Sequence, residues 1–234
     1  PMVTVVEVMG RNAGWLTAAA QLAVSKGQGP DLIYLPEVVF DYDQFFKDVE
    51  EVVKRKTKAI IVVSEGIKDK DGKYVPEHYS NLSTDSFGHA QLGGTAAILA
   101  EQIKEKLNVK VRSIEFSLLQ RSAAHLASKV DVREAYMAGV KAVRAAVKGT
   151  TDKMVGFERV SSNPYKIKYK LVPLAKAANT EKKVPAEWIL PNGQGLTQDF
   201  VDYALPLIQG DDKAPLVDGL PRFAKLKKVF VTKK

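Results

Sequence analysis

The chain has 234 residues, of which 45% are hydrophobic, and its 35 lysines and arginines outnumber its 27 aspartates and glutamates, giving a net charge of +8. This length can bury a substantial core, and no apolar run approaches the ~18 residues of a membrane span. With no cysteine and three histidines that are far apart, disulfides and thiolate metal sites are excluded and no metal site is predicted. We expect a soluble, cytoplasmic protein with no membrane partner.

The first stretch, Val3 to Val24, has the pattern of a strand, a turn and a helix. Residues 3–6 and 8 are nearly all valine, which predicts a strand buried on both faces of a parallel sheet, interrupted only by Glu7. Gly10 permits a sharp turn, and a helix is expected from Ala13 onward. Free N–H groups at that helix start, together with the guanidinium of Arg11, favour binding of a phosphate ester or carboxylate. An ordinary loop with a solvated arginine is the alternative.

Two further strand–helix units follow. Residues 31–35 and 58–64 are short apolar runs that predict buried strands, and the apolar spacing over 41–56 predicts an amphipathic helix capped by Asp41 or Asp43. Strands that alternate with helices indicate a parallel sheet with right-handed crossovers. We therefore expect an α/β fold built on an open, mostly parallel sheet with helices on both faces.

The central part of the chain continues this alternation after an interruption. Residues 68–90 are polar and lack periodicity, which predicts a mobile excursion or lid, and helix is expected over 96–107. A fourth strand is expected over 109–119, followed by a long helix over 131–147 that is capped by Asp131.

The remaining sequence predicts a β-hairpin and an irregular extension. Residues 154–159 and 165–174 flank a Ser-Ser-Asn-Pro turn, and from Ala175 the chain is rich in proline, glycine and lysine, with a helix expected only around 197–208. We divide the chain into an α/β domain over 1–158 and a hairpin with C-terminal extension over 159–234 that packs on it. The lysines after position 150 follow no nucleic-acid motif, so we interpret them as a solvated face and expect no nucleic-acid partner.

Four polar elements follow predicted parallel strands or lie at their ends. They are Met9-Gly10-Arg11, Pro36-Glu37, Ser64-Glu65-Gly66 and Gln120-Arg121. Because the carboxyl ends of the strands converge on one crevice in such sheets, we expect these elements to lie together. Two arginines and a carboxylate suit a phosphorylated polyol, since guanidinium groups bind phosphate and carboxylates accept hydroxyl protons. Taken singly, the glutamate could be a solvent-facing loop residue and the second arginine a helix-cap or ion-pair residue.

These segments also resemble a known family. VEVMGRNAGWLTAAAQLA, YLPEVVFD, VVSEG and VRSIEFSLLQR, in this order, are similar to the sugar-phosphate-binding half of the 6-phosphofructokinases, over most of Val3 to Glu158. The SAAHLASKVDVREAYMAGVKAV segment and the PYK hairpin resemble the pyrophosphate-using branch. The resemblance implies a glycolytic transferase that phosphorylates the 1-hydroxyl of fructose 6-phosphate to give fructose 1,6-bisphosphate, with pyrophosphate preferred over ATP as donor. It also implies a homo-oligomer, either a dimer or a tetramer.

The resemblance assigns roles to individual positions. The Met9-Gly10-Arg11 turn would hold fructose 6-phosphate, and Arg11 would stabilise the phosphoryl group during transfer. Glu65 would accept hydrogen bonds from the sugar hydroxyls, and Arg121 would bind the 6-phosphate. Arg112 corresponds to the arginine that reaches a neighbouring subunit's site.

This sequence also departs from the family pattern. Leu118 replaces a histidine and Met2 a basic residue of the common ATP enzyme, and Lys166 or Tyr165 could compensate. The family's donor loop, its catalytic aspartate and its Mg²⁺ ligands are expected N-terminal to Pro1. The chain is therefore expected to be a fragment that supplies the acceptor side of the site and is inactive alone. A non-catalytic sugar-phosphate-binding or regulatory module is the alternative.

Overall fold

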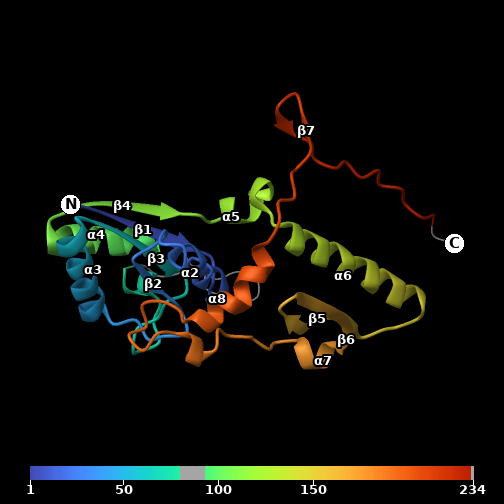
Figure 1. The fold of residues 1–234 in the computed structure, drawn as a ribbon, viewed down its shortest axis with the longest axis horizontal. Coiled ribbons are helices and arrows are strands. Elements are labelled where there is room, and N and C mark those ends of the chain that lie inside the picture. The colour runs from blue at the N-terminus through green and yellow to red at the C-terminus, as the bar shows by residue number, and fades with distance from the viewer. Residues whose placement is uncertain (80–92, 233–234) are drawn as a thin grey trace.

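A computed structural model describes residues 1–79 and 93–232. Four parallel strands form the central sheet in the order β2-β3-β1-β4 (Figure 1). Their bounds are β1 Met2–Val8, β2 Leu32–Tyr34, β3 Lys58–Ser64 and β4 Lys110–Glu115. The predicted parallel sheet is confirmed, and β1 lies inside it between β3 and β4. The predicted excursion over residues 80–90 lies outside the described residues.

Helices pack on both faces of the sheet, as predicted. Helix α3 (Tyr42–Lys56) and helix α4 (Thr95–Leu107) cover one face, where Val3 and Val5 are buried with side chains from both helices. Helices α1 (Trp15–Ala18), α2 (Gln21–Val24) and α8 (Gln198–Ala204) form a second core with Ile33. Because successive side chains of a strand point to opposite faces, this second core lies on the other side of β2.

The prediction that β1 is buried on both faces is wrong. Val3 and Val5 are fully buried, whereas the alternate residues Thr4 and Val6 are only half-buried. Their neighbours on that face, Ile60 and Ile114, are 44% and 43% exposed. The second core, which contains α1, α2 and α8, forms around Ile33 and Leu35 at the β2 edge, so the middle of the second face is more open.

Three element ends differ from the sequence expectation. The helix expected from Ala13 forms as the two short helices α1 and α2. The fourth strand ends at Glu115 rather than at residue 119, because Ser117 adopts a positive φ of 40° before α5 (Leu119–Ser122). The long helix α6 (Lys129–Val147) is capped by Ser128, whose hydroxyl accepts from the N–H of Asp131, so Asp131 is not the cap. Of the two caps predicted for α3, Asp41 or Asp43, the structure has Asp41.

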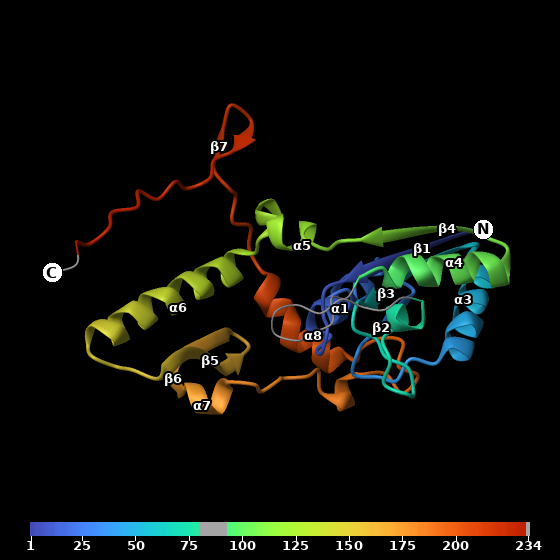
Figure 2. The same ribbon diagram turned by 180° about the vertical axis from the view of Figure 1, so that it is seen from behind.

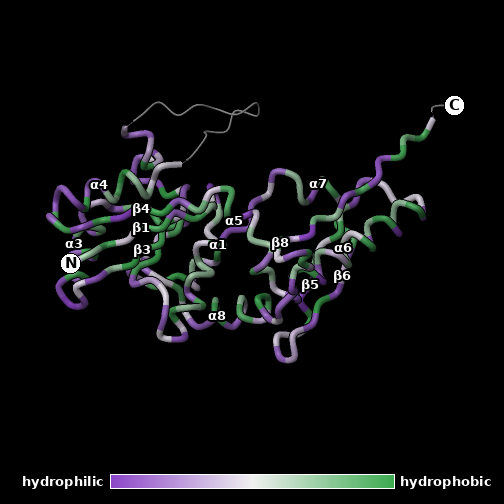
Figure 3. Tube along the Cα trace, turned by 90° about the horizontal axis from the view of Figure 1, so that it is seen from above, coloured by the Kyte–Doolittle hydropathy of each residue, from purple (hydrophilic) through white to green (hydrophobic). Residues whose placement is uncertain are grey.

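Helix α6 and the hairpin lie beside the sheet body (Figures 1 and 2). Strands β5 (Lys153–Ser162) and β6 (Tyr165–Pro173) form the predicted antiparallel hairpin, and α6 has no buried residue. Figure 3 shows that hydrophobic residues run most continuously along the sheet strands. The remaining short elements are η1 Val75–His78, η2 Ala124–Leu126, α7 Leu174–Ala177, η3 Ala186–Trp188, η4 Leu205–Ile208, β7 Leu216–Val217 and β8 Leu220–Pro221.

Candidate functional site

The turn after β1 is tied to the ends of its neighbouring strands. The N–H of Gly10 donates to Glu65 Oε1 over 3.1 Å, and the N–H of Met9 donates to Gln120 Oε1 over 3.1 Å. The hydroxyl of Ser64 donates to the carbonyl oxygen of Gly10. Parallel strands bring these three segments to one edge, and the hydrogen bonds fix the turn there.

Two glycines allow the close packing of this turn. A Cβ atom on Gly66 would lie 1.8 Å from the carbonyl oxygen of Arg11, which is far inside van der Waals contact. A Cβ atom on Gly10 would lie 2.9 Å from both the carbonyl oxygen of Ala13 and the hydroxyl oxygen of Ser64. The space at Gly10 is therefore filled by the chain's own backbone and by a neighbouring side chain.

Arg11 carries an unused donor. Its Nε atom is buried and has no hydrogen-bond partner among the described residues. An unpaired buried donor is uncommon in folded proteins and costs free energy. An acceptor oxygen of a bound anion would satisfy this donor, which fits the anion-binding role predicted for the turn.

Glu7 is a buried carboxylate next to the site. Its side chain is 3% exposed, and its Oε2 atom accepts from the N–H of Ala96 over 2.9 Å. Burial raises the pKa of Glu7 to about 7; the bond from Ala96 opposes this rise, and the nearby carboxylates of Glu115 and Glu65 add to it. The sequence alone assigned no role to Glu7. A charged residue within the valine run of β1 is the feature that could have pointed to a special role for it.

Glu37 was expected to face the crevice, but both of its carboxylate oxygens bind backbone. They accept from the N–H of Gly14 over 2.9 and 3.2 Å, and one also accepts from the N–H of Val184 over 2.9 Å. Glu37 therefore joins the start of α1 to the C-terminal part of the chain.

Residues 181–184, here called the strap, hold the outer side of the turn. The amide of Asn12 donates to Glu181 Oε1 over 2.5 Å, and the indole N–H of Trp15 donates to the carbonyl oxygen of Lys182 over 2.6 Å. The Trp15 ring also contacts Trp188, with centroids 6.2 Å apart. The C-terminal extension thus helps to shape the candidate site, which the sequence did not indicate.

The two remaining predicted arginines have different positions. Arg121 lies on α5, is exposed, and directly follows Gln120, which contacts the turn. Arg112 is exposed on β4 and pairs with Thr4 of β1. Thr4 is six residues before Gly10, which is about 20 Å along the strand at the ~3.3 Å rise of a parallel strand. The structure therefore places Arg121 at the border of the turn and Arg112 apart from it.

The described residues offer no metal site. No group of three or more His, Asp or Glu side chains in this part of the chain could hold a metal ion. None of the helices within the described ranges has the length and apolar character needed to cross a membrane.

Comparisons with known proteins show which family this chain and its fold are similar to. The family model described as Phosphofructokinase matches residues 1–146. A relative from Xanthomonas campestris pv. campestris, named pyrophosphate–fructose 6-phosphate 1-phosphotransferase, is 47% identical over 239 aligned residues, which cover 99% of this chain and 56% of the relative. Solved structures of pyrophosphate-dependent phosphofructokinases from Marinobacter aquaeolei and Nitrosospira multiformis match with TM-scores of 0.83 at 36% and 39% identity, and each match covers 99% of this chain and 54% of the other. The chain spans about half the length of the relatives it matches.

Proposed function

The chain belongs to the phosphofructokinase family, and from this premise we propose that it supplies the fructose 6-phosphate half of a pyrophosphate-dependent 6-phosphofructokinase. The observation that carries the proposal is the hydrogen bond from Gly10 to Glu65, which fixes the Arg11 turn beside a carboxylate. Pyrophosphate is preferred over ATP as donor because relatives that are 47% and 45% identical are named for it.

In the proposed reaction, the 1-hydroxyl oxygen of fructose 6-phosphate attacks one phosphorus of pyrophosphate. The bridging P–O bond breaks, inorganic phosphate leaves, and the hydroxyl proton passes to a base that the resemblance expects outside this chain. Arg11 would donate to the transferring phosphoryl group, since its Nε has no partner among the described residues. Glu65 would use its remaining acceptor capacity for a sugar hydroxyl, and the main-chain groups of Met9 and Gly10 would shape the sugar's position.

The 6-phosphate would be bound by Arg121. Leu118, at the family's histidine position, is 69% exposed and can donate no hydrogen bond from its side chain, so the phosphate would have one donor fewer on this wall. We propose that Arg112, which stands apart on β4, serves the site of a neighbouring copy in a dimer or tetramer. No group of three or more His, Asp or Glu side chains within residues 1–79 and 93–232 could hold Mg²⁺, and the resemblance expects the Mg²⁺ ligands outside this chain.

Titration calorimetry with fructose 6-phosphate tests the proposal. Arg11→Ala and Arg121→Ala should each weaken binding by about tenfold or more, because each removes a charge-assisted hydrogen bond to a phosphate. Arg144→Ala, at an exposed position on α6, is the matched control and should bind like the wild type. If both site variants bound fructose 6-phosphate with the wild-type affinity, the proposed binding site would be wrong. With pyrophosphate added, the isolated chain should release no phosphate, and turnover would contradict its role as the acceptor half.

A further inference from the structure

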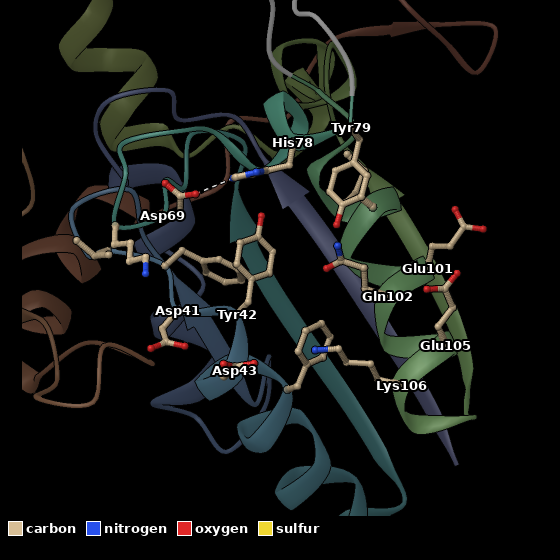
Figure 4. Close-up of a pocket in the computed structure, with 15 residues that line it drawn as sticks. Asp41, Tyr42, Asp43, Asp69, His78, Tyr79, Glu101, Gln102, Glu105 and Lys106 are labelled. Atoms are coloured by element: carbon tan, nitrogen blue, oxygen red, sulfur yellow. Dashed lines mark hydrogen bonds and ion pairs between the residues drawn. The ribbon is translucent and has the colours of Figure 1, made fainter.

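A cavity of ≈ 1050 Å³ lies outside the candidate site (Figure 4). Its walls come from the N-terminal half of α3, one side of α4, and segments around residues 69–70 and 78–79. None of the residues that form the turn after β1 lines it. The volume is that of a pocket for a small organic ligand, so its chemistry decides which class it could take.

The lining is acidic although the whole chain is basic. Five carboxylates line the cavity against two lysines and one histidine, in a chain with a net charge of +8. Three of the five, Asp43, Glu101 and Glu105, have no hydrogen-bond or ion-pair partner within the described ranges. The other two are engaged: Asp41 caps α3, and Asp69 accepts from His78 Nε2 over 2.6 Å. Among the described residues, the cavity is thus a local centre of unpaired negative charge.

Aromatic rings complete the walls. Tyr42 and Phe46 from α3 and Tyr79 from the opposite side all line the cavity. The chain's own Lys106 places its ammonium 3.9 Å from the centroid of Phe46. Ring faces attract cations, and ammonium groups bind best where carboxylates are also close. The same walls would therefore bind further ammonium groups.

Two buried polar atoms at the cavity find no hydrogen-bond partner in the part of the chain that the structure describes. The hydroxyl oxygen of Tyr42 and the Oε1 atom of Gln102 are both buried and unpaired among the described residues. In Figure 4 the Tyr42 hydroxyl points between His78 and Tyr79. Buried polar atoms are nearly always hydrogen-bonded in folded proteins, and an N–H donor of a ligand would satisfy both acceptors.

The spacing of the carboxylates decides whether a metal ion or an organic ammonium compound fits the cavity better. No group of three or more His, Asp or Glu side chains that could hold a metal ion exists among the described residues, so a cation held mainly by protein ligands around one point is not favoured. Glu101 and Glu105 are one turn apart on α4, while Asp43 lies across the cavity on α3. Charges spread along a cavity with aromatic walls match ammonium groups spread along an aliphatic chain. We propose that this cavity is a binding site for a linear organic polyamine.

Calorimetry of the 234-residue chain with spermidine at low ionic strength tests the proposal. The wild type should bind it saturably with one site, and Glu101→Gln/Glu105→Gln should weaken binding by about tenfold or more. Both positions are exposed, so the fold should tolerate the change. Glu51→Gln, an exposed glutamate on α3 that does not line the cavity, is the control and should leave the affinity unchanged.

Tyr42→Phe provides a second, independent variant. It removes the buried hydroxyl, so spermidine affinity should fall severalfold while the thermal stability of the free chain stays equal or rises. The neutral diol 1,8-octanediol should not bind. Unchanged spermidine affinity in both variants, equal binding of the diol, or displacement of spermidine by an equal concentration of Mg²⁺ would each overturn the proposal. None of these readouts depends on fructose 6-phosphate, so the two proposals fail separately.

Discussion

The carboxylate of Glu7 accepts a hydrogen bond from the N–H of Ala96 over 2.9 Å, which joins the end of β1 to the first turn of α4. Gly94, at the N-terminal cap of α4, offers no side-chain acceptor, so Glu7 satisfies a helix N–H from another element. The neighbouring Thr95 hydroxyl donates to the carbonyl oxygen of Glu65 over 3.3 Å. The start of α4 is thereby linked to two of the strand ends that form the candidate site.

We expect Glu7 to make stability depend on pH. Its pKa in the folded chain is raised to about 7 from 4.5, so the folded state binds more protons than the unfolded state between these values. The contribution of Glu7 to the free energy of unfolding is therefore complete below about pH 4.5. It is lost as the pH rises through about 7, which lowers the free energy of unfolding by about 3 kcal/mol. Glu7→Gln should flatten this slope, as measured by urea unfolding at pH 5 and pH 8. Parallel pH dependence in the two proteins would show that Glu7 is not the group responsible.

Gly66→Ala should strongly destabilise the chain. The new methyl carbon would lie 1.8 Å from the carbonyl oxygen of Arg11, which is a backbone atom and cannot swing aside as a flexible side chain could. We expect a loss of about 3 kcal/mol or more in the free energy of unfolding. Gly139→Ala, on α6 where a Cβ atom meets nothing within 4 Å, is the control and should stabilise by about 0.5–1 kcal/mol. Equal changes in melting temperature for the two variants would contradict the close packing of Gly66 against Arg11.

Glu37→Ala should release the strap. It leaves the N–H groups of Gly14 and Val184 without their acceptor, which should cost about 2–3 kcal/mol. Limited trypsin digestion should then cut faster after Lys182 and Lys183. Glu51→Ala serves as the control and should be cut at the wild-type rate. A variant that keeps the wild-type digestion pattern would mean that Trp15 and Asn12 hold the strap without Glu37.

Arg159 connects the hairpin to the C-terminal helix segment. Its Nη2 atom donates to the carbonyl oxygen of Tyr203 over 2.7 Å, and its guanidinium lies 4.3 and 4.8 Å from the ring centroids of Tyr203 and Tyr165. Arg159→Met keeps the apolar stem but loses these contacts, which should cost about 1–3 kcal/mol. Hydrogen exchange in β5 and β6 should become faster. Arg144→Met, exposed on α6, should leave exchange there unchanged.

The order of strands and helices could be predicted from sequence because it depends on local patterns. The valine run of β1 and the Asp41 cap of α3 are signals contained in a few neighbouring residues. The family motif around Arg11 is equally local, and it led to the family that the comparisons support. The end of β4 was predicted wrongly because residues 116–119 are as apolar as a strand, whereas the chain turns at Ser117.

The sequence alone therefore determined the α/β architecture, the family and the candidate turn. Only the tertiary structure decided which polar groups pair, since these pairings join residues far apart in the chain. Glu37 and Val184 are 147 positions apart, and Glu7 and Ala96 are 89 apart. Such contacts leave no periodic signal, because their geometry exists only after the sheet has brought the strand ends together. The strand–turn–helix pattern of Val3 to Val24 was visible in the sequence. The strap that holds its turn and the bond that the buried Glu7 accepts from Ala96 were not.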